Sequence, residues 1–344
     1  MDRKTQRLFS LKRRYVVGVT VCAILLLLLT VGIYSGLRFM RTTGITPGVM
    51  FSLVADDGIA LKSSNGRSNV LLMGSGGGNH EGPDLTDTMM VMSIDTKKKS
   101  VSLISIPRDT WSDTLKDKVN SAYHYGEEKK KGGGMILAKV VVEDIIGMPI
   151  HYGLLIDFSG FKKIIDLLGG VDVNVTRAFT DNDYPIAGKE HDTCPGDPTN
   201  RCVYETIHFD VGVQHMDGER ALKYARSRHA EGAEGSDFAR GRRQQDIVVA
   251  LKDKLVHPTR WFSSERVNEL PHVLDEATDT DMNMGELATV GKWFIKTKEA
   301  SVKKISFDTL LEEPAPGLFG GRYVLVPIDD WDHVHTYLKE QVGK

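Results

Sequence analysis

The chain has 344 residues, 41% of them hydrophobic, and a formal net charge of -2 at neutral pH. This is enough for one large domain or two ordinary ones with a full core. A slightly acidic chain lacks the basic excess of a nucleic-acid-binding domain, so we expect no nucleic-acid partner.

The N-terminal region predicts a membrane anchor. Residues 1–14 carry six lysines and arginines, and residues 15–37 then run for 23 residues without a charge, enough to cross a bilayer as a helix. Only Arg38 and Arg41 follow closely, so the positive-inside rule keeps the N-terminus in the cytoplasm. The alternative is a cleaved signal peptide, but the apolar run exceeds a usual signal core and no A-x-A site follows it. We expect a cytoplasmic basic tail over 1–14, a transmembrane helix over 15–37, and a cell-membrane protein whose remaining chain is extracytoplasmic.

Beyond the anchor, residues 38–67 contain the turn signals ITPG and KSSNGRS and predict a stalk, which leaves 68–344 for the folded domain. Cys194 and Cys202 are the only cysteines of that domain, and they bracket the turn-rich sequence PGDPTNR. In an oxidising compartment a short disulfide is favoured over two free thiols.

The first part of the domain alternates strand and helix patterns. Short apolar runs predict strands at NVLLM (69–73), TMMVMSID (88–95), SVSLISI (100–106), HYGLLIDF (151–158) and GGVDVNV (169–175). The second and third runs are joined by TKKK and predict an antiparallel hairpin. Helical spacing occupies 135–146 and 160–168. This alternation indicates a layered α/β sheet domain with helices on its faces.

The later part continues with mixed elements. A long polar insertion covers 177–210 and carries the cysteine pair, and a helix runs to about Leu255 after an arginine-rich stretch. We expect further helices near 284–296 and 331–341, and strands at VKKISF (302–307) and RYVLVPI (322–328).

Arginine is concentrated in one stretch, Tyr224–Asp246, which holds five arginines and no lysine. The planar guanidinium suits bidentate contact with phosphate or carboxylate and tolerates partial burial better than lysine. Four acidic residues lie among these arginines, so a solvated, salt-bridged surface is the competing interpretation.

A helix through FARGRRQQDIVVALKDKL, capped by Asp237, separates the two interpretations. Its apolar stripe leads back to Arg240 and Gln244, with Arg243 beside them, whereas Arg242 points the other way. The inward stripe therefore ends in arginine and glutamine at the first turn, where free backbone N–H groups and the helix dipole favour an anion. This pattern favours an anion site.

Two further polar groups follow predicted strands. SVSLISI ends in Pro107-Arg108-Asp109-Thr110, and the Gly-rich loop after NVLLM leads to Asp87. In open α/β sheets, ligands bind at the carboxyl ends of strands. The loop fits neither the phosphate-binding loop nor G-x-G-x-x-G, so a plain flexible loop stays open as an interpretation. Three interpretations stay open for Asp87 and Asp109: they are buried partners of arginines, metal ligands or bases.

A set of sequence blocks within 69–255 resembles the LytR-CpsA-Psr family of bacterial envelope proteins. The blocks are NVLLMG, TDTMMV, SIPRDT, KVNSAYHYG, GFKKIIDLLGGVDVNV, MDGERALKYARSRH and SDFARGRRQQ, in the family's order and behind its usual single anchor. The resemblance implies a three-layer α/β/α sandwich with a central mixed sheet, behind a single transmembrane helix. It also implies a phosphotransferase that binds a polyprenyl pyrophosphate in an apolar tunnel and moves its glycopolymer onto peptidoglycan.

The resemblance also assigns roles to residues. The family's pyrophosphate-contacting residues fall on Arg108, Arg226, Arg228, Arg240 and Gln244. Asp87 matches a ligand of the family's magnesium, so the catalytic residues expected from the resemblance are Arg108, Asp87 and Arg240.

The chain departs from the family at two positions. The family has an aspartate shortly after the glycine of the first strand, where this chain has Ser75 and Gly76, and an arginine where this chain has Leu85. One magnesium ligand is therefore missing or replaced, and we expect weaker Mg²⁺ binding than two carboxylates would give. The candidates to replace it are His80, Glu81 and Asp84.

In the expected reaction an acceptor sugar hydroxyl attacks the phosphorus joined to the glycan, and polyprenyl phosphate leaves. The protein then acts mainly by positioning and by neutralising charge, while Asp87 binds magnesium or deprotonates the hydroxyl. Two alternatives stay open: a hydrolase, in which water takes the acceptor's place, and a non-catalytic binder of lipid-linked glycan.

Overall fold

The computed structural model describes residues 59–78, 82–189, 192–197, 199, 201–257, 264–298, 301–315 and 317–343, together with 30 and 32–34. The predicted basic tail, most of the predicted transmembrane helix and most of the predicted stalk therefore lie outside the described residues. Within the part that is described, we find no helix that combines the length and the apolar character needed to cross a membrane. Asp57–Lys344 forms one compact unit, which contains the predicted folded domain.

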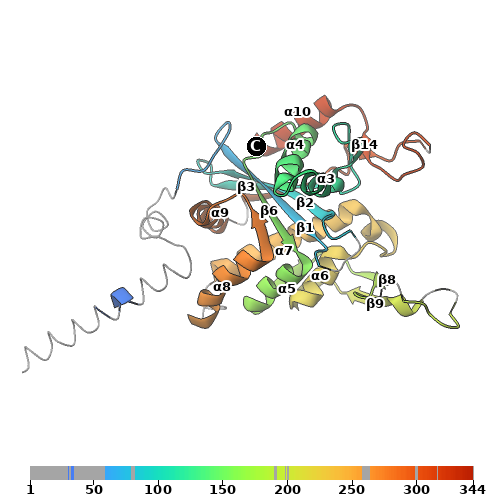
Figure 1. Cartoon of the computed structure of the whole chain (residues 1–344), viewed down its shortest axis with the longest axis horizontal. Coiled ribbons are helices and arrows are strands. Elements are labelled where there is room, and N and C mark those ends of the chain that lie inside the picture. Colours follow the sequence, from blue (N-terminus) through green and yellow to red (C-terminus); the bar gives the residue numbers. More distant parts are fainter. Residues whose placement is uncertain are drawn as a thin grey trace, which may run out of the picture. The chain divides into compact units, whose positions relative to one another are not determined.

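A six-stranded mixed sheet lies at the centre of this unit (Figure 1). Its strand order is β11 (Thr278–Thr280), β6 (Tyr152–Asp157), β1 (Arg67–Ser75), β2 (Thr86–Asp95), β3 (Ser100–Ile106) and β12 (Val302–Ile305). β1 pairs with β6 and β3 with β12 in parallel, whereas β1–β2, β2–β3 and β6–β11 are antiparallel. The predicted hairpin and the mixed sheet are confirmed.

Side chains of the central strands alternate between two cores, as the pleat of a strand requires. Leu71 and Met73 of β1 face α3 (Ala122–Lys129), α4 (Gly133–Ile146) and α10 (Trp331–Gly343). Val70 faces the opposite way, in a core shared with α7 (Asp237–Val256) and α9 (Met284–Lys296). Figure 1 shows these helices on the two faces of the sheet, which makes three layers.

A smaller core lies beside the sheet, around α5 (Phe158–Leu167), α6 (Gly218–Arg226) and one side of α7. The predicted strand at GGVDVNV is present as β7 (Val171–Val175), but it pairs with β10 (Gly212–Met216) outside the central sheet. The expected polar insertion is instead a hairpin of β8 (Phe179–Pro185) and β9 (Tyr204–Phe209). Apolar side chains at alternate positions bury one face of it, and Phe179 stacks on Phe209. Cys194 and Cys202 form a disulfide within the connection between its strands.

The remaining elements are short or peripheral. They are β4 (Trp111–Ser112), β5 (Asp117–Lys118), η1 (Val119–Ser121), η2 (Arg201–Val203), η3 (Gly232–Gly235), α8 (Ser264–Ala277), β13 (Leu311–Glu312) and β14 (Val326–Pro327). The strand expected over 322–328 is therefore reduced to two residues, paired with β13.

The helix starts follow ordinary capping chemistry. Asp157 caps α5, Asp217 caps α6 and Asn283 caps α9, each by accepting a hydrogen bond from a backbone N–H of the first turn. The cap of α7 is Ser236, which accepts from the Ala239 backbone N–H. Asp237 is the first residue inside the helix, so the prediction that it caps α7 is wrong by one position.

Candidate functional site

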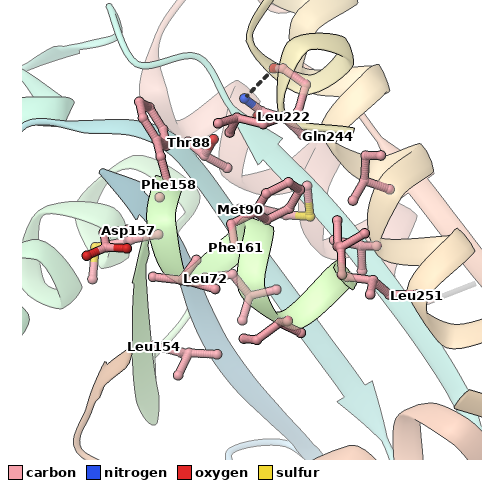
Figure 2. Close-up of a pocket in the computed structure, with 18 of the residues that line it drawn as sticks. Leu72, Thr88, Met90, Leu154, Asp157, Phe158, Phe161, Leu222, Gln244 and Leu251 are labelled. Atoms are coloured by element: carbon pink, nitrogen blue, oxygen red, sulfur yellow. Dashed lines mark hydrogen bonds between the residues drawn. The ribbon is translucent and has the colours of Figure 1, made fainter. Parts of the chain in front are cut away.

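An apolar cavity of about 250 Å³ lies between the sheet and the helices beneath it (Figure 2). Strands β1, β2 and β6 form its roof, and α5, α6, α7 and α8 contribute the other walls. Its labelled apolar side chains in Figure 2 include Leu72, Met90, Leu154, Phe161, Leu222 and Leu251. Such a lining suits an extended hydrocarbon group.

A second, polar cavity of about 620 Å³ adjoins the apolar one, and Thr88, Arg226 and Gln244 line both. The structure brings all six predicted site residues to this polar cavity, from four separate parts of the chain. They are Asp87, Arg108, Arg226, Arg228, Arg240 and Gln244.

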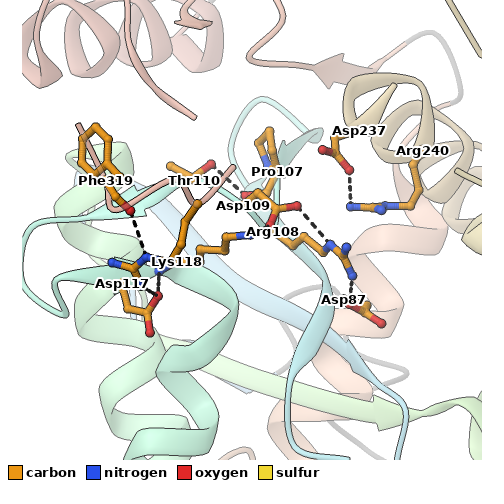
Figure 3. Close-up of polar contacts among 11 residues, drawn as sticks. Asp87, Pro107, Arg108, Asp109, Thr110, Asp117, Lys118, Asp237, Arg240 and Phe319 are labelled. Atoms are coloured by element: carbon orange, nitrogen blue, oxygen red, sulfur yellow. Dashed lines mark hydrogen bonds and ion pairs between the residues drawn. The ribbon is translucent and has the colours of Figure 1, made fainter. Parts of the chain in front are cut away.

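At the end of β3, Arg108 lies between two carboxylates (Figure 3). Its guanidinium contacts Asp87 at 2.5 Å and Asp109 at 3.1 Å, and Lys118 contacts the other oxygen of Asp109 at 2.5 Å. Burial alone would raise the pKa of Asp109, but the hydrogen bond from Lys118 and the charge of Arg108 outweigh it and lower the pKa below 3.8. Lys118 thus belongs to the site, although no role was predicted for it from the sequence.

Helix α7 is held close to the sheet at its first two turns. The amide of Gln245 donates to the carbonyls of Leu103 in β3 and Ile305 in β12, both at 2.9 Å. A Cβ added at Gly241 would lie 2.3 Å from the Ser105 hydroxyl oxygen, so a larger residue would force that side chain to move. Because Gly241 and Gln245 hold α7 against the sheet, they fix the direction in which Arg240, the residue before Gly241, points.

Arg240 is only 5% exposed, and its guanidinium contacts Asp237 one turn earlier at 2.7 Å. Burial lowers the pKa of Arg240, and Asp237 opposes that shift. Gln244, one turn further on, is also buried, and its amide makes a long contact of 3.4 Å to the Ala225 carbonyl. The predicted pairing of Arg240 and Gln244 on one helix face is confirmed.

The end of α6 and the segment after it supply the remaining two arginines. The Arg226 guanidinium stacks on Phe158 at 4.1 Å, while the Arg228 side chain is exposed at the cavity. The buried carboxylate of Asp181 in β8 accepts the backbone N–H groups of Arg228 and His229, at 3.2 and 3.1 Å, and so fixes this turn. Asp181 was not predicted from the sequence, because the pattern of β8 indicated only a polar insertion.

Arg243 does not share the cavity, contrary to expectation. It is 2% exposed, and its guanidinium donates to the backbone carbonyls of Tyr224 at 3.0 Å, Glu234 at 2.9 Å and Ser227. Arg243 therefore fastens α7 to the segment after α6. Arg242 contacts Asp308 at 3.5 Å and lines another cavity, as its predicted direction requires.

Few side chains of the polar cavity could hold a metal ion. Ser75 is buried and Leu85 lines the polar cavity, while Asp84 is exposed in the turn before β2. His80 and Glu81 lie outside the described residues. Across the described ranges there is no group of three or more histidine, cysteine or acidic side chains placed to hold a metal.

Comparison with known proteins identifies a family model that spans most of the chain and relatives that match about half of it. The LytR_cpsA_psr family model matches residues 52–339. The chain is 31% identical over 192 residues to the polyisoprenyl-teichoic acid–peptidoglycan teichoic acid transferase TagU of Bacillus mycoides, covering 54% of this chain and 52% of the relative. TagV of Bacillus subtilis, a protein with the same description, is 31% identical over 190 residues, which cover 42% of its length. The chain thus spans about half the length of the curated relatives it matches.

Solved structures agree on the fold. The crystal structure of B. subtilis TagV superposes with a TM-score of 0.57 at 25% identity, covering 82% of this chain and 99% of that one. TagT bound to LI-WTA superposes with a TM-score of 0.55 at 22% identity, covering 84% and 98%. Because the family model covers most of the chain and the fold agrees, the protein belongs to the LytR_cpsA_psr family.

Proposed function

We propose that this protein transfers a glycopolymer from a polyprenyl pyrophosphate carrier to peptidoglycan. The observation that carries the proposal is the junction of an apolar cavity with an arginine-lined polar cavity at Thr88, Arg226 and Gln244. A lipid with a pyrophosphate head has the same division between an apolar chain and an anionic group. The curated relatives are named as transferases of teichoic acid between polyisoprenyl-teichoic acid and peptidoglycan, and these names support the same reaction class.

In this reaction the acceptor hydroxyl oxygen attacks the phosphorus joined to the glycan. A new P–O bond forms, the bond to the bridging oxygen breaks, and polyprenyl phosphate leaves with the electron pair. The hydroxyl proton passes to water. The main task of the protein is then to hold the pyrophosphate and neutralise its charge, which Arg108 and Arg240 do in the proposal.

The partners of these arginines suit that role. Arg108 and Arg240 are held by the carboxylates of Asp87, Asp109 and Asp237. Phosphate oxygens make the same bidentate, charge-assisted contacts as carboxylates. A pyrophosphate can therefore take the place of an aspartate as the partner of a guanidinium, so that the guanidinium keeps an anionic partner.

Magnesium fits this site only together with the substrate. Both oxygens of Asp109 already contact Arg108 and Lys118, which leaves Asp87, at 28% side-chain exposure, as the carboxylate able to hold the ion. Mg²⁺ is commonly bound by one or two carboxylates plus substrate phosphates. In the proposal Asp87 would hold magnesium beside the pyrophosphate, where the ion neutralises charge. Calorimetric titration of Mg²⁺ with inorganic pyrophosphate present should show binding to the wild type that Asp87→Asn abolishes.

A transfer assay tests the proposal. The full chain in detergent is mixed with a short-chain prenyl pyrophosphate saccharide and purified peptidoglycan, and the saccharide is followed by mass spectrometry. We expect it on peptidoglycan through a phosphodiester, with prenyl phosphate released. Soluble saccharide would instead identify a hydrolase, and binding without turnover would identify a carrier protein.

Membrane anchoring is a separate part of the proposal, supported by the uncharged run at 15–37. A lipid-linked donor lies in the membrane, so an anchored enzyme stays close to it. A reporter fused after Lys344 should be active only outside the cytoplasm. Cytoplasmic activity of that reporter would contradict both the topology and the functional proposal.

A further inference from the structure

A loop near the C-terminus is hydrogen-bonded to the backbone of Asp109, a residue that lines the polar cavity, although the proposed transfer gives this loop no role. The backbone N–H of Leu325 donates to the carbonyl of Asp109 at 2.9 Å, and the N–H of Trp111 donates to Leu325 at 2.8 Å. The segment 317–325 is thereby tied to the residues that follow Arg108.

This loop and the strand it pairs with carry three aromatic residues, Trp111, Phe319 and Tyr323, which we call the aromatic rim. Trp111 and Phe319 pack edge to face with centroids 4.7 Å apart. The Arg322 guanidinium lies 5.2 Å from the Trp111 ring and contacts Asp117 at 2.9 Å. The rim therefore combines aromatic surface with a carboxylate and a guanidinium.

Of the rim residues, Tyr323 lies close to Lys118, which lines the polar cavity. Tyr323 is 46% exposed, and Lys118 lies 6.0 Å from its ring. Burial, followed by the charges of Asp237 and Asp109, raises the pKa of Tyr323 to about 12, in keeping with its position beside the site. Figure 3 shows Phe319 and Asp117 on one side of Lys118, with Arg108 and Asp87 on the other.

The rim is separated from the apolar cavity by the charged residues. Lys118 and Asp109 line the polar cavity but not the apolar one, which the polar cavity meets at Thr88, Arg226 and Gln244. In a phosphoryl transfer the attacking and leaving oxygens lie roughly in line across the phosphorus. If prenyl phosphate leaves toward the apolar cavity, the attacking hydroxyl arrives from the side of Lys118 and the rim.

We infer that the aromatic rim binds a sugar ring of the acceptor glycan. Aromatic side chains offer a large rigid surface for the apolar face of a pyranose, and neighbouring charged groups hydrogen-bond its hydroxyls. Tyr323 supplies the exposed ring, while Asp117 and Arg322 supply an acceptor and donors. The inference rests on the proposed function, because the direction of attack identifies the sugar as the acceptor's.

Binding measurements with the full chain in detergent test the inference. The probes are soluble peptidoglycan glycan strands, freed of stem peptides by an amidase, and a short-chain prenyl pyrophosphate. Tyr323→Ala should weaken strand binding about three- to tenfold, the effect of one aromatic contact. Tyr323→Phe keeps the ring and should stay within about twofold of wild type. The matched control is Tyr204→Ala, another exposed tyrosine, on β9, which should also stay within about twofold.

Each other outcome overturns the inference. The rim is not part of the acceptor site if wild type and Tyr323→Ala bind the strands with equal affinity. The same holds if Tyr204→Ala loses as much strand affinity as Tyr323→Ala. Weaker prenyl pyrophosphate binding in Tyr323→Ala would place the donor there instead. Failure of the proposed function is seen separately, because the transfer assay would then place no saccharide on peptidoglycan, whatever the strand measurements gave.

Discussion

Arg240 and Arg243 lie three residues apart on α7, and both are almost fully buried, yet their surroundings differ in kind. Arg240 has a carboxylate partner and faces the polar cavity. The guanidinium of Arg243 is occupied by three backbone carbonyls and Glu234, and it lies over the Phe179 ring.

The difference teaches how to distinguish a binding arginine from a structural one. An arginine held by a carboxylate beside a cavity can exchange that partner for a ligand anion of the same charge. An arginine saturated by carbonyls cannot, since its departure would leave several buried acceptors unpaired. Burial alone does not separate the two, because both residues are almost equally buried.

The largest expected effect is on stability, at Arg243. Arg243→Ala removes the donor for three carbonyls and takes from Glu234 the nearer of its two arginine partners. We expect a loss of about 3–5 kcal/mol in the free energy of unfolding. Thermal unfolding of the full chain checks this, and an unfolding temperature equal to that of wild type would contradict the structural role.

Arg240→Ala should act on binding rather than folding. Loss of one charge-assisted contact to pyrophosphate costs about 1.5–3 kcal/mol, or roughly ten- to a hundredfold in affinity. We expect this loss in titrations with a short-chain prenyl pyrophosphate, with the thermal unfolding temperature close to wild type. If donor affinity is retained, the cavity is not the pyrophosphate site.

A smaller, pH-dependent effect on stability is expected at Lys118, which contacts the Asp109 carboxylate. Lys118→Met removes a partner that lowers the pKa of Asp109. A lowered carboxyl pKa stabilises the folded state above the ordinary value of 3.8, and this contribution is lost as pH falls through the folded value. The free energy of unfolding of wild type should exceed that of the variant by about 1–2 kcal/mol at neutral pH, allowing for the partial exposure of Lys118.

The difference in stability between wild type and Lys118→Met should shrink near pH 3, which thermal unfolding at the two pH values tests. A gap that persists unchanged in acid would mean that Lys118 stabilises the fold without Asp109.

The smallest effect is expected at Arg242, which serves as the matched control for both neighbours. Its contact with Asp308 is long, at 3.5 Å, and its side chain is 40% exposed. Such pairs contribute roughly 0–1 kcal/mol. Arg242→Ala should therefore leave both unfolding temperature and donor affinity near wild type. Effects as large as those of Arg240→Ala would remove the distinction between the faces of α7.

Local pattern was enough for many of the regular elements, but it gave no prediction for α3, α6 and α8. Alternating and continuous apolar runs marked β1, β2, β3 and β6, and helical spacing marked α4, α5, α7, α9 and α10. It failed for β8 and β9, because their exposed faces are polar and the connecting loop is rich in turn residues. Pattern also gave no pairing for β7, since a strand's partner is set by contacts distant in the sequence.

The amino-acid sequence already contained the family blocks, the arginine-rich helix face and the six residues that meet at the polar cavity. Helical spacing placed Arg240 with Gln244 and directed Arg242 away, because these directions depend on backbone geometry alone. The tertiary structure decided the partners. Arg243 is structural because carbonyls near the end of α6 reach it, and Asp181 and Lys118 join the site because β8 and β5 are folded against it. Such partners are brought together by long-range packing, which no local spacing encodes.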